Sequence, residues 1–472
     1  MTELHDLTAV EQAAAIRRRE IGPVELVDHY LDRIRRLDGE LGAFVTVTDD
    51  AARAQAREAE RAVRSGADLP PLHGVPTAIK DVTPTAGVPT SYGSRAFKGY
   101  VPDVDASVVT ALRAAGMISL GKTATSEFAL MPHCETDLGI ETRNPWDTAR
   151  SAHGSSGGAA AAVAAGLVPV AHAGDGGGSI RIPAGACGLV GLKASRDRVF
   201  SGPAPSDVAG VAIEGALTRT VRDAAAALDA LAADQPGQLA LVRRPATSFA
   251  ACAEQPPVRL RIARHVVPLT DAVVAPECRA AYEEATAALT AAGHEVTDIE
   301  PPMDPGFVDA FADVWAVLAA GAPIPPDGEP LLRPITTMLR ERGRPISATR
   351  LAAARGLLET VSRGFVAATA GFDAVLTPTA PYGPRPAGWF TQAGDPEDEF
   401  ARTVRFVAFA PLQNASGQPA ISLPVHWTGD GLPIGVTLTA RPADEATLLR
   451  LGAQLEAAVR WTNRKPALWG AR

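Results

Sequence analysis

Apolar residues recur with helical spacing in the first 66 residues of this 472-residue chain. Thr8 and Glu11 have the spacing of a capping box, which predicts a helix from there to about residue 20. A second predicted helix begins at Pro23, and its apolar face is formed by Val24, Val27, Leu31, Ile34 and Leu37. An alanine-rich run predicts a third helix over 51–64. We therefore expect an N-terminal helical layer at 1–66, with little chemistry on it.

After residue 66, short apolar stretches alternate with longer stretches of helical periodicity. Strands are predicted at 77–79, 117–121, 259–263, 294–299, 372–376, 420–425 and 432–440. Helices are predicted at 105–115, 221–233, 275–291 and 443–459. This alternation favours α/β layers throughout the chain.

The rest of the chain falls into two segments, and it contains no internal repeat. A polar, proline-containing stretch at 235–257 separates residues 67–234 from residues 258–472. Residues 301–345 are rich in proline with scattered aromatic side chains. Such a composition is more typical of a segment that covers a pocket than of a sheet.

Composition narrows the class of protein. Apolar residues make up 46% and charged residues 21%, as in ordinary folded proteins, and the net charge of −8 argues against nucleic-acid binding through a basic surface. The N-terminus lacks the features of a signal peptide, and the longest uncharged run, 151–174, is too rich in small residues to span a bilayer. The cysteines are far apart, so neither a disulfide framework nor a metal site is indicated: Cys134, Cys187, Cys252 and Cys278. We expect a cytoplasmic protein with buried thiols, no metal and no membrane association.

Glycine is concentrated between residues 153 and 193, where it frames Ser155, Ser156 and Ser179. A chain seldom places so much glycine in one region unless the backbone must approach something closely or adopt positive φ. The loop 174–181 could form an anion nest, but it lacks the signatures of nucleotide-binding loops, and a tight structural turn is a rival interpretation. A GxSxG pattern is centred on Ser156, yet no apolar strand leads into it, which disfavours an α/β-hydrolase elbow.

A serine hydroxyl needs a base that accepts its proton before it can attack a carbonyl. His153 and His172 flank the serines, but neither lies in a motif that makes it an obvious base. Lys80, at the end of a predicted strand, is the alternative, provided that burial lowers its pKa from about 10.4 by roughly 3–5 units. The uncharged stretch 154–174 would favour a neutral lysine. Backbone N–H groups could stabilise an oxyanion at Gly176, Gly177 and Gly178.

Several motifs in one order resemble the amidase signature family. They lie at 74–81, 154–158 and 175–184, with further similar stretches at 143–147, 187–193 and 417–424, so the resemblance covers nearly the whole chain. It implies a large twisted mixed sheet covered by helices on both faces. It also implies one domain, 1–472, with a catalytic core at 67–234 and the remainder of the core, with pocket-covering loops, at 258–472.

The resemblance also implies a role for each motif residue. Ser179 would be the acyl nucleophile, Ser155 a bridging serine on a cis peptide, and Lys80 the base. Ser156 would steady this relay by hydrogen bonding, and the glycine loop would be braced by Asp175 and Arg181.

This sequence departs from the common family pattern at three places. Ala152-His153 stands where Pro-Gly usually precedes the serine pair, so His153 would line the mouth of the pocket. Gly176 replaces a residue that usually carries a side chain, and Lys193 is followed by Ala-Ser rather than Pro-Thr. The stretches 171–179 and 127–132 are most similar to a branch that contains cyclic aminohexanoate-oligomer hydrolases.

The sequence therefore predicts a cofactor-independent serine amidohydrolase that cleaves a small-molecule carboxylic amide, with ester cleavage also open, and that could form a homodimer. The alternative is the amidase subunit of a tRNA-dependent amidotransferase, which releases ammonia from glutamine, and a silent binding protein on the same fold is a further rival. Scattered Phe, Trp and Met at 126–134, 301–345 and 382–410 indicate pocket walls that suit an apolar or aromatic substrate group.

Overall fold

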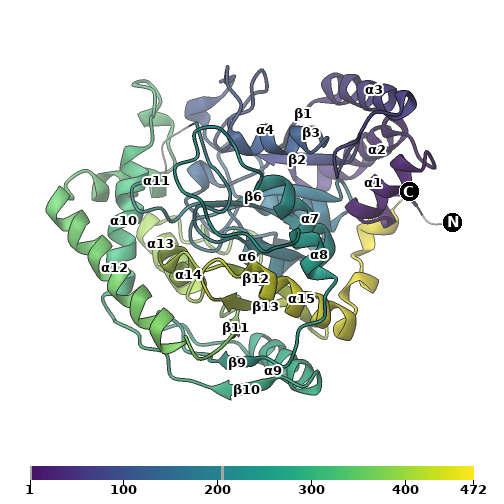
Figure 1. Ribbon diagram of the computed structural model, residues 1–472. Helices are drawn as coiled ribbons and strands as arrows, with labels where there is room; N and C mark the ends of the chain where they lie inside the picture. Colours follow the sequence, from purple (N-terminus) through teal and green to yellow (C-terminus); the bar gives the residue numbers. More distant parts are fainter. Residues whose placement is uncertain (1–2, 204–206, 472) are drawn as a thin grey trace.

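An eight-stranded mixed sheet forms the centre of the computed structural model, which describes residues 3–203 and 207–471 (Figure 1). The strands lie in the order β10 (Glu295–Asp298), β9 (Arg261–Arg264), β11 (Ala374–Pro378), β13 (Pro433–Ala440), β12 (Ala420–Trp427), β7 (Val190–Lys193), β8 (Ile213–Thr218) and β6 (Val170–Asp175). The β10–β9 and β9–β11 pairs are parallel and the others antiparallel. Because β7 pairs with β12, the sheet takes strands from both segments, 67–234 and 258–472.

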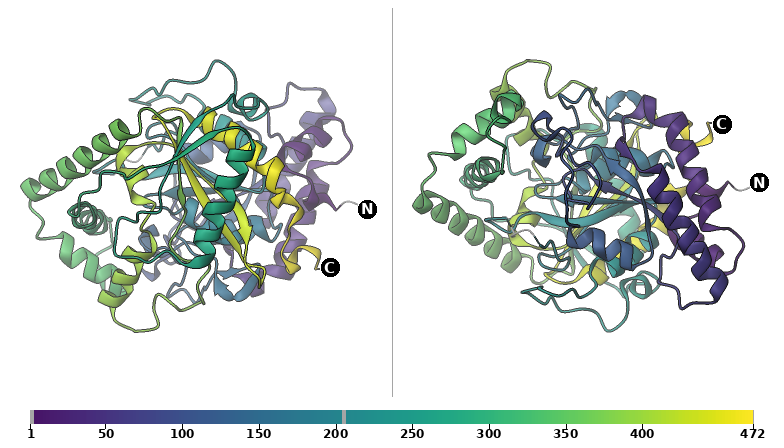
Figure 2. Two further views of the ribbon diagram at one scale, coloured as in Figure 1. Left: turned by 90° about the horizontal axis from the view of Figure 1, so that it is seen from below. Right: turned by 90° about the horizontal axis from the view of Figure 1, so that it is seen from above.

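Helices cover both faces of this sheet, as predicted. One face packs against α7 (Val221–Leu231), α9 (Pro276–Ala291) and α15 (Glu445–Val459), and the left view of Figure 2 looks onto α9 and α15. The other face packs against α5 (Gly157–Ala164) and α6 (Arg181–Cys187). Helix α5 was not predicted from the sequence. All eight of its residues are buried, and a Cβ at Gly158 would lie only 2.3 Å from the Ala124 nitrogen. Only very small side chains fit in so narrow a space.

A second, three-stranded sheet lies beside the N-terminal helices. Its order is β1 (Phe44–Val47), β3 (Ile118–Thr123) and β2 (Pro76–Lys80). The helices around it are α1 (Ala9–Arg17), α2 (Pro23–Leu41), α3 (Asp49–Ser65) and α4 (Ser107–Ala114). The three helices predicted in the N-terminal layer at 1–66 are present as α1, α2 and α3, and the layer also contains β1, which was not predicted and pairs antiparallel with β3. The predicted strand that ends at Lys80 is confirmed as β2.

A group of helices, green in Figure 1, lies to one side of the large sheet: α10 (Phe307–Gly321), α11 (Pro334–Gly343), α12 (Ala348–Ala368), α13 (Pro396–Phe406) and α14 (Pro411–Ser416). Residues 301–345, which were expected to cover a pocket rather than build a sheet, form no strand, and most of that range is helical. Its prolines lie before α10, between α10 and α11, at the first position of α11 and just after α11, so none interrupts the hydrogen bonds of a helix interior.

The remaining elements are short. They are β4 (Arg143–Asn144) and β5 (Asp147–Ser151), which pair as a hairpin, the helix α8 (Phe249–Ala253), and 3₁₀ turns at Leu4–Asp6, Arg95–Phe97, Glu127–Ala129, Glu329–Leu331, Trp461–Asn463 and Ala467–Gly470. The four cysteines are free and buried, as predicted. Across residues 3–203 and 207–471, no helix is long and apolar enough to cross a membrane.

Candidate active site

Lys80, Ser155 and Ser179 lie on three separate segments that hydrogen bonds join to one another. Lys80 ends β2, Ser155 lies between β5 and α5, and Ser179 lies between β6 and α6. The lysine is 1% exposed, and its Nζ donates hydrogen bonds to Ser155 Oγ at 2.8 Å and to the Gly174 carbonyl at 3.2 Å. The predicted lysine–serine pair is thus in direct contact, although 75 residues separate the two in sequence.

Hydrogen bonds from Ser156 join the two serine segments. The Ser156 N–H donates to the Ser179 carbonyl at 3.3 Å, and the Ser156 hydroxyl donates to the Gly174 carbonyl at 3.2 Å. The Gly154–Ser155 peptide is cis, as the family resemblance implied. The Gly174 carbonyl therefore accepts hydrogen bonds from both Lys80 and Ser156 and fixes them relative to each other.

Burial lowers the pKa of Lys80 to about 8. Three acidic groups oppose this effect, the largest contribution coming from Glu214, followed by Cys134 and Asp175. The expectation of uncharged surroundings is therefore only partly correct, because Glu214 and Asp175 bring carboxylates close to the lysine. The pKa is still low enough for a substantial neutral fraction at mildly alkaline pH.

The glycine run that precedes Ser179 is explained by close neighbours. A Cβ at Gly176 would lie 3.1 Å from the Trp315 ring, and one at Gly178 would lie 2.7 Å from Ala410, where φ is also +120°. The departure from the family pattern at Gly176 thus has a physical reason, since Trp315 occupies the space of the usual side chain. The Gly178 N–H donates to Asp175 Oδ1 at 2.7 Å.

Asp175 and Arg181 form a buried pair that braces this loop. Arg181 donates to both Asp175 carboxylate oxygens, through Nε at 2.9 Å and Nη2 at 3.0 Å. Burial alone would raise the pKa of Asp175, but the Arg181 guanidinium holds it well below its usual range. Two further partners from α14 were not predicted: Gln413 accepts from Arg181 at 2.9 Å, and Asn414 accepts from Arg181 at 2.7 Å and donates to Asp175.

Neither flanking histidine has the position expected of a base for the serines. His172 Nδ1 accepts from the Lys80 backbone N–H at 3.4 Å, and its Nε2 lies 2.9 Å from Glu214 Oε2. His153 is 1% exposed and stacks on Phe406, with the ring centroids 4.5 Å apart, and burial lowers its pKa to about 3. The backbone φ of His153 is +61°, which accounts for the glycine that is usual at this position.

His153 does not line the cavity at Ser179, contrary to the expectation from the sequence. It lies on a smaller neighbouring cavity instead, and its Nε2 accepts from the Arg385 N–H at 3.1 Å. Within the described ranges, no group of three or more His, Cys, Asp or Glu side chains could hold a metal ion.

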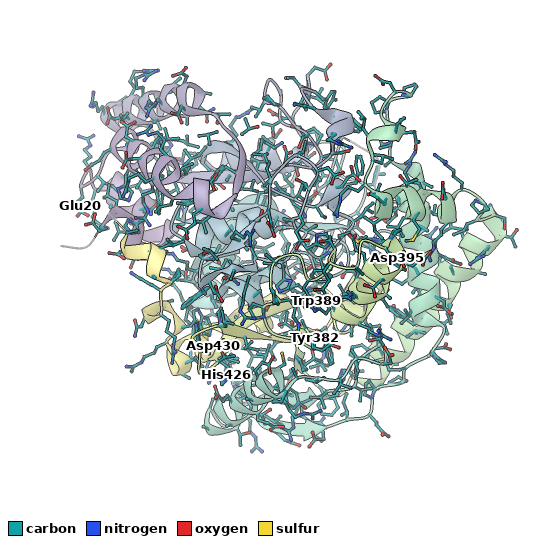
Figure 3. All side chains as sticks on the ribbon, turned by 180° about the vertical axis from the view of Figure 1, so that it is seen from behind. Glu20, Tyr382, Trp389, Asp395, His426 and Asp430 are labelled. Carbon is teal, nitrogen blue, oxygen red and sulfur yellow. The ribbon has the colours of Figure 1, made fainter. Side chains whose placement is uncertain are left out.

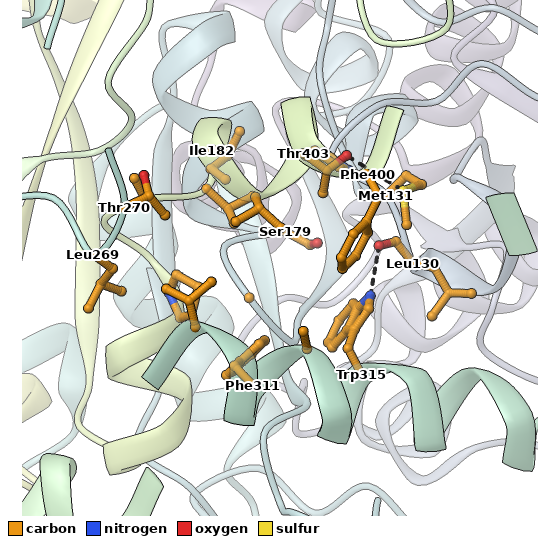
Figure 4. Close-up of a pocket in the computed structure, with 18 of the residues that line it drawn as sticks. Leu130, Met131, Ser179, Ile182, Leu269, Thr270, Phe311, Trp315, Phe400 and Thr403 are labelled. Carbon is orange, nitrogen blue, oxygen red and sulfur yellow. Dashed lines mark hydrogen bonds between the residues drawn. The ribbon is translucent and has the colours of Figure 1, made fainter. Parts of the chain in front are cut away.

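Ser179 lies on an apolar cavity of about 690 Å³, open mouth included (Figure 4). Phe311 and Trp315 on α10 face the serine from one side, and Met131 and Phe400 from another. The Trp315 indole is fixed by a hydrogen bond from Nε1 to the Leu130 carbonyl at 3.1 Å. Among the described residues that line the cavity, none carries a charge; the complete lining is Leu130, Met131, Pro132, Gly177, Ser179, Ile182, Leu269, Thr270, Phe307, Val308, Phe311, Ala312, Trp315, Phe400, Thr403, Val404, Val407, Ala408 and Pro411.

All three stretches expected to form pocket walls contribute to this cavity. Residues 126–134 supply Leu130 to Pro132, α10 supplies the wall from 301–345, and α13 supplies most of the wall from 382–410. Leu269 and Thr270 were missed, since they lie in a short irregular stretch that carries no pocket signal of its own. An aromatic cluster packs behind the α13 wall, and it includes Tyr382 and Trp389, which are labelled in Figure 3.

This combination of fold and side chains belongs to one class of protein. A family model described as Amidase matches residues 25–449, so the chain belongs to the amidase family. The chain is 40% identical to the putative amidase AmiB2 of Mycobacterium tuberculosis (strain ATCC 25618 / H37Rv), over 99% of each protein. It is 36% identical to a 6-aminohexanoate-cyclic-dimer hydrolase of Pseudomonas sp. (strain NK87), over 98% of this chain and 96% of that protein.

Solved structures are similar over the same length. A 6-aminohexanoate cyclic dimer hydrolase complexed with substrate matches with a TM-score of 0.91 at 34% identity. The match covers 99% of this chain and 100% of that one. A bacterial aryl acylamidase of the amidase signature family has a TM-score of 0.89 at 26% identity, with both chains fully covered. The predicted family, fold class and enzyme class, an amide hydrolase, are thereby confirmed.

The alternative prediction has weaker support. A glutamyl-tRNA(Gln) amidotransferase subunit from Thermotoga maritima is similar with a TM-score of 0.79 at 26% identity, over 97% of this chain and 95% of that one. Both values are lower than those for the cyclic dimer hydrolase.

Proposed function

We propose that this amidase-family enzyme cleaves a neutral carboxylic amide through an acyl-enzyme on Ser179, with Ser155 and Lys80 as its proton relay. The observation that carries the proposal is the 2.8 Å hydrogen bond between Lys80 Nζ and Ser155 Oγ, in a buried site tied to the Ser179 backbone. A serine becomes nucleophilic when its proton has a route to a base, and a buried neutral amine supplies that base.

The relay works in both directions. Neutral Lys80 takes the proton of Ser155, Ser155 takes the proton of Ser179, and Ser179 Oγ bonds to the substrate carbonyl carbon. The relay then returns the proton to the amide nitrogen, the C–N bond breaks and the amine leaves. Water repeats the sequence on the acyl-enzyme, which releases the carboxylic acid and restores Ser179. An ester would follow the same route with an alcohol as leaving group.

The negative charge that develops on the carbonyl oxygen needs hydrogen-bond donors. Asp175 already accepts the Gly178 N–H, so we assign this role to the amides of Gly176, Gly177 and Ser179. Asp175 and Arg181 hold the loop in shape, which keeps the donors oriented before the reaction. Preorganised donors of this kind typically contribute about 10²–10³ in rate each.

The cavity favours an apolar or aromatic group on the substrate, as the relatives that hydrolyse a cyclic aminohexanoate dimer and aryl acylamides also suggest. Glutamine carries an α-ammonium and an α-carboxylate, and burying them beside Phe311 and Trp315 without partners would be costly. The lining therefore favours a free-standing amidase over the amidotransferase component.

Covalent labelling tests the nucleophile. A fluorophosphonate should add once to wild-type enzyme, on the peptide that contains Ser179, and Ser179→Ala should remove both the label and amide turnover, by a factor on the order of 10⁶. Ser65→Ala, at an exposed position, is the control and should label and turn over like wild type. Label on another serine, or turnover by Ser179→Ala, would refute the assignment.

A second arm of the experiment separates the two functions. The purified chain should hydrolyse anilides or alkyl amides and release no ammonia from glutamine. Ammonia release from glutamine that exceeds anilide hydrolysis would favour the amidotransferase function.

A further inference from the structure

Lys80 is held by one strand of the large sheet, β6, and the neighbouring strand β8 places Glu214 beside these contacts. Its backbone N–H donates to His172 on β6, and its Nζ donates to the carbonyl of Gly174, also on β6. In the antiparallel β6–β8 ladder, Gly174 is the register partner of Glu214. The Glu214 side chain is thus placed next to the carbonyl that binds the lysine.

His172 connects Glu214 to the lysine. Its Nδ1 accepts from the Lys80 N–H at 3.4 Å, so the ring proton lies on Nε2, which donates to Glu214 Oε2 at 2.9 Å. The His172 side chain is fully buried, and the Glu214 side chain is 26% exposed. A histidine fixed at both ring nitrogens cannot turn, and it holds the end of β2 against β6.

Gly174 provides the space for the glutamate. A Cβ on Gly174 would lie 3.0 Å from Glu214 Oε2, so a larger residue would displace the carboxylate. The contact with Glu214 therefore explains why residue 174 is a glycine, which the position of the loop around Ser179 alone does not explain.

Other charged groups near Lys80 do not substitute for Glu214. Asp175 is committed to Arg181, and the Cys134 thiol donates to the Ser155 carbonyl at 3.2 Å, while burial raises its pKa to about 11. Lys122, on the adjacent strand β3, donates to the Thr83 carbonyl and lies 3.9 Å from Asp81.

We propose that Glu214, acting through His172 and beside Gly174, is a positioning residue that orients Lys80 and sets the pH range in which Lys80 serves as base. This inference rests on the proposed role of Lys80. The carboxylate favours the ammonium form of the lysine and counteracts the effect of burial. The hydrogen bond from His172 keeps that carboxylate ionised, because it holds the pKa of Glu214 below its usual range although burial would raise it.

The test compares the pH dependence of kcat/KM for an anilide in three proteins. In Glu214→Gln the amide oxygen can still accept from His172, so the geometry is kept while the charge is removed. Lys80 should then lose its proton more easily, and the acidic limb should move to lower pH by roughly one unit. Glu214→Asp keeps a negative charge, so its limb should stay near that of wild type even if the shorter side chain lowers kcat.

Glu284→Gln is the matched control. Glu284 Oε1 also bonds to a histidine, His426 Nδ1, at 2.9 Å, and it is not among the groups that shift the Lys80 pKa. His426, labelled in Figure 3, is the second-last residue of β12. The limb should not move in this variant.

An unchanged or alkaline-shifted limb in Glu214→Gln would overturn the inference, as would an equal shift in Glu284→Gln. If Glu214→Gln does not fold, Glu214→Met removes the same charge at the same length and should show the same acidic shift. Lys80→Met separates the two proposals: activity in that variant would remove the basis of the proposed function. An inactive Lys80→Met together with an unmoved Glu214→Gln limb would refute only the role of Glu214.

Discussion

The polar region around Lys80 and Ser155, which we propose as the proton relay, differs in composition from the apolar cavity on which Ser179 lies. Around Lys80 the site is buried, polar and crosslinked by hydrogen bonds from β2, β6, β8 and the serine loop. Around Phe311 and Trp315 the cavity is apolar, and helices α10 and α13 supply much of its wall. The first region can fix reacting groups in place, and the second can only select substrates by size and apolar surface.

Two buried lysines sharpen this comparison. Burial lowers the pKa of both Lys80 and Lys122 to about 8. Lys122 contacts the Thr83 carbonyl and the hydroxyls of Thr85 and Thr90. Only Lys80 of these two donates a hydrogen bond to a serine hydroxyl, that of Ser155. A lowered pKa therefore does not identify a base without the hydrogen-bond partner.

The largest effect on stability is expected when a charged side chain of the polar region is removed. Arg181→Met leaves the Asp175 carboxylate buried without its cation, and loss of a partner from such a pair typically costs about 3–5 kcal/mol of unfolding free energy. The midpoint of urea denaturation, with tryptophan fluorescence as the probe, measures the loss.

Arg18→Met is the control for Arg181, because both partners of its pair with Glu20 are more than half exposed, and it should leave the midpoint unchanged. Equal stability of Arg181→Met and wild type would show that the loop does not depend on this pair.

A substitution in the wall of the apolar cavity should alter the selectivity between substrates. Trp315→Ala removes one wall of the cavity and should lower kcat/KM for an anilide by about 10–100-fold, mainly through KM, while a small alkyl amide is affected less. Steady-state kinetics on the two substrates measure the ratio.

Trp427→Ala removes an indole that does not line the cavity, and it should leave the ratio of the two substrates unchanged. A uniform loss of kcat in Trp315→Ala would contradict a role in selection and would place Trp315 with the relay, through its contact with Gly176.

The two regions were not equally predictable from the sequence. Lys80, Ser155 and Ser179 each lie in a short sequence motif, so they could be predicted as site residues from the sequence alone. The His172–Glu214 contact depends on the β6–β8 register across 42 residues, and the Ala- and Gly-rich sequences of β6, β7 and β8 give only a weak strand signal.

The cavity walls were located correctly but their structure was not. Residues 301–345 were expected to cover a pocket, but the helices α10 and α11 within them were not predicted, and nothing in the sequence pattern fixed which face of α10 meets Ser179. Residues 348–368 form a full helix, α12, that was not predicted from the sequence. Packing between distant segments decided these features.

The rate of fluorophosphonate labelling of Ser179 as a function of pH tests the central claim most directly, because it reports activation of the nucleophile without a substrate. Below the Lys80 pKa of about 8 the relay lacks its acceptor, so the labelling rate should fall about tenfold per pH unit, and it should level off above that pH. Lys80→Met should label about 10²–10⁴ times more slowly. A rate that is flat from mildly acidic to alkaline pH, or wild-type labelling in Lys80→Met, would contradict the account.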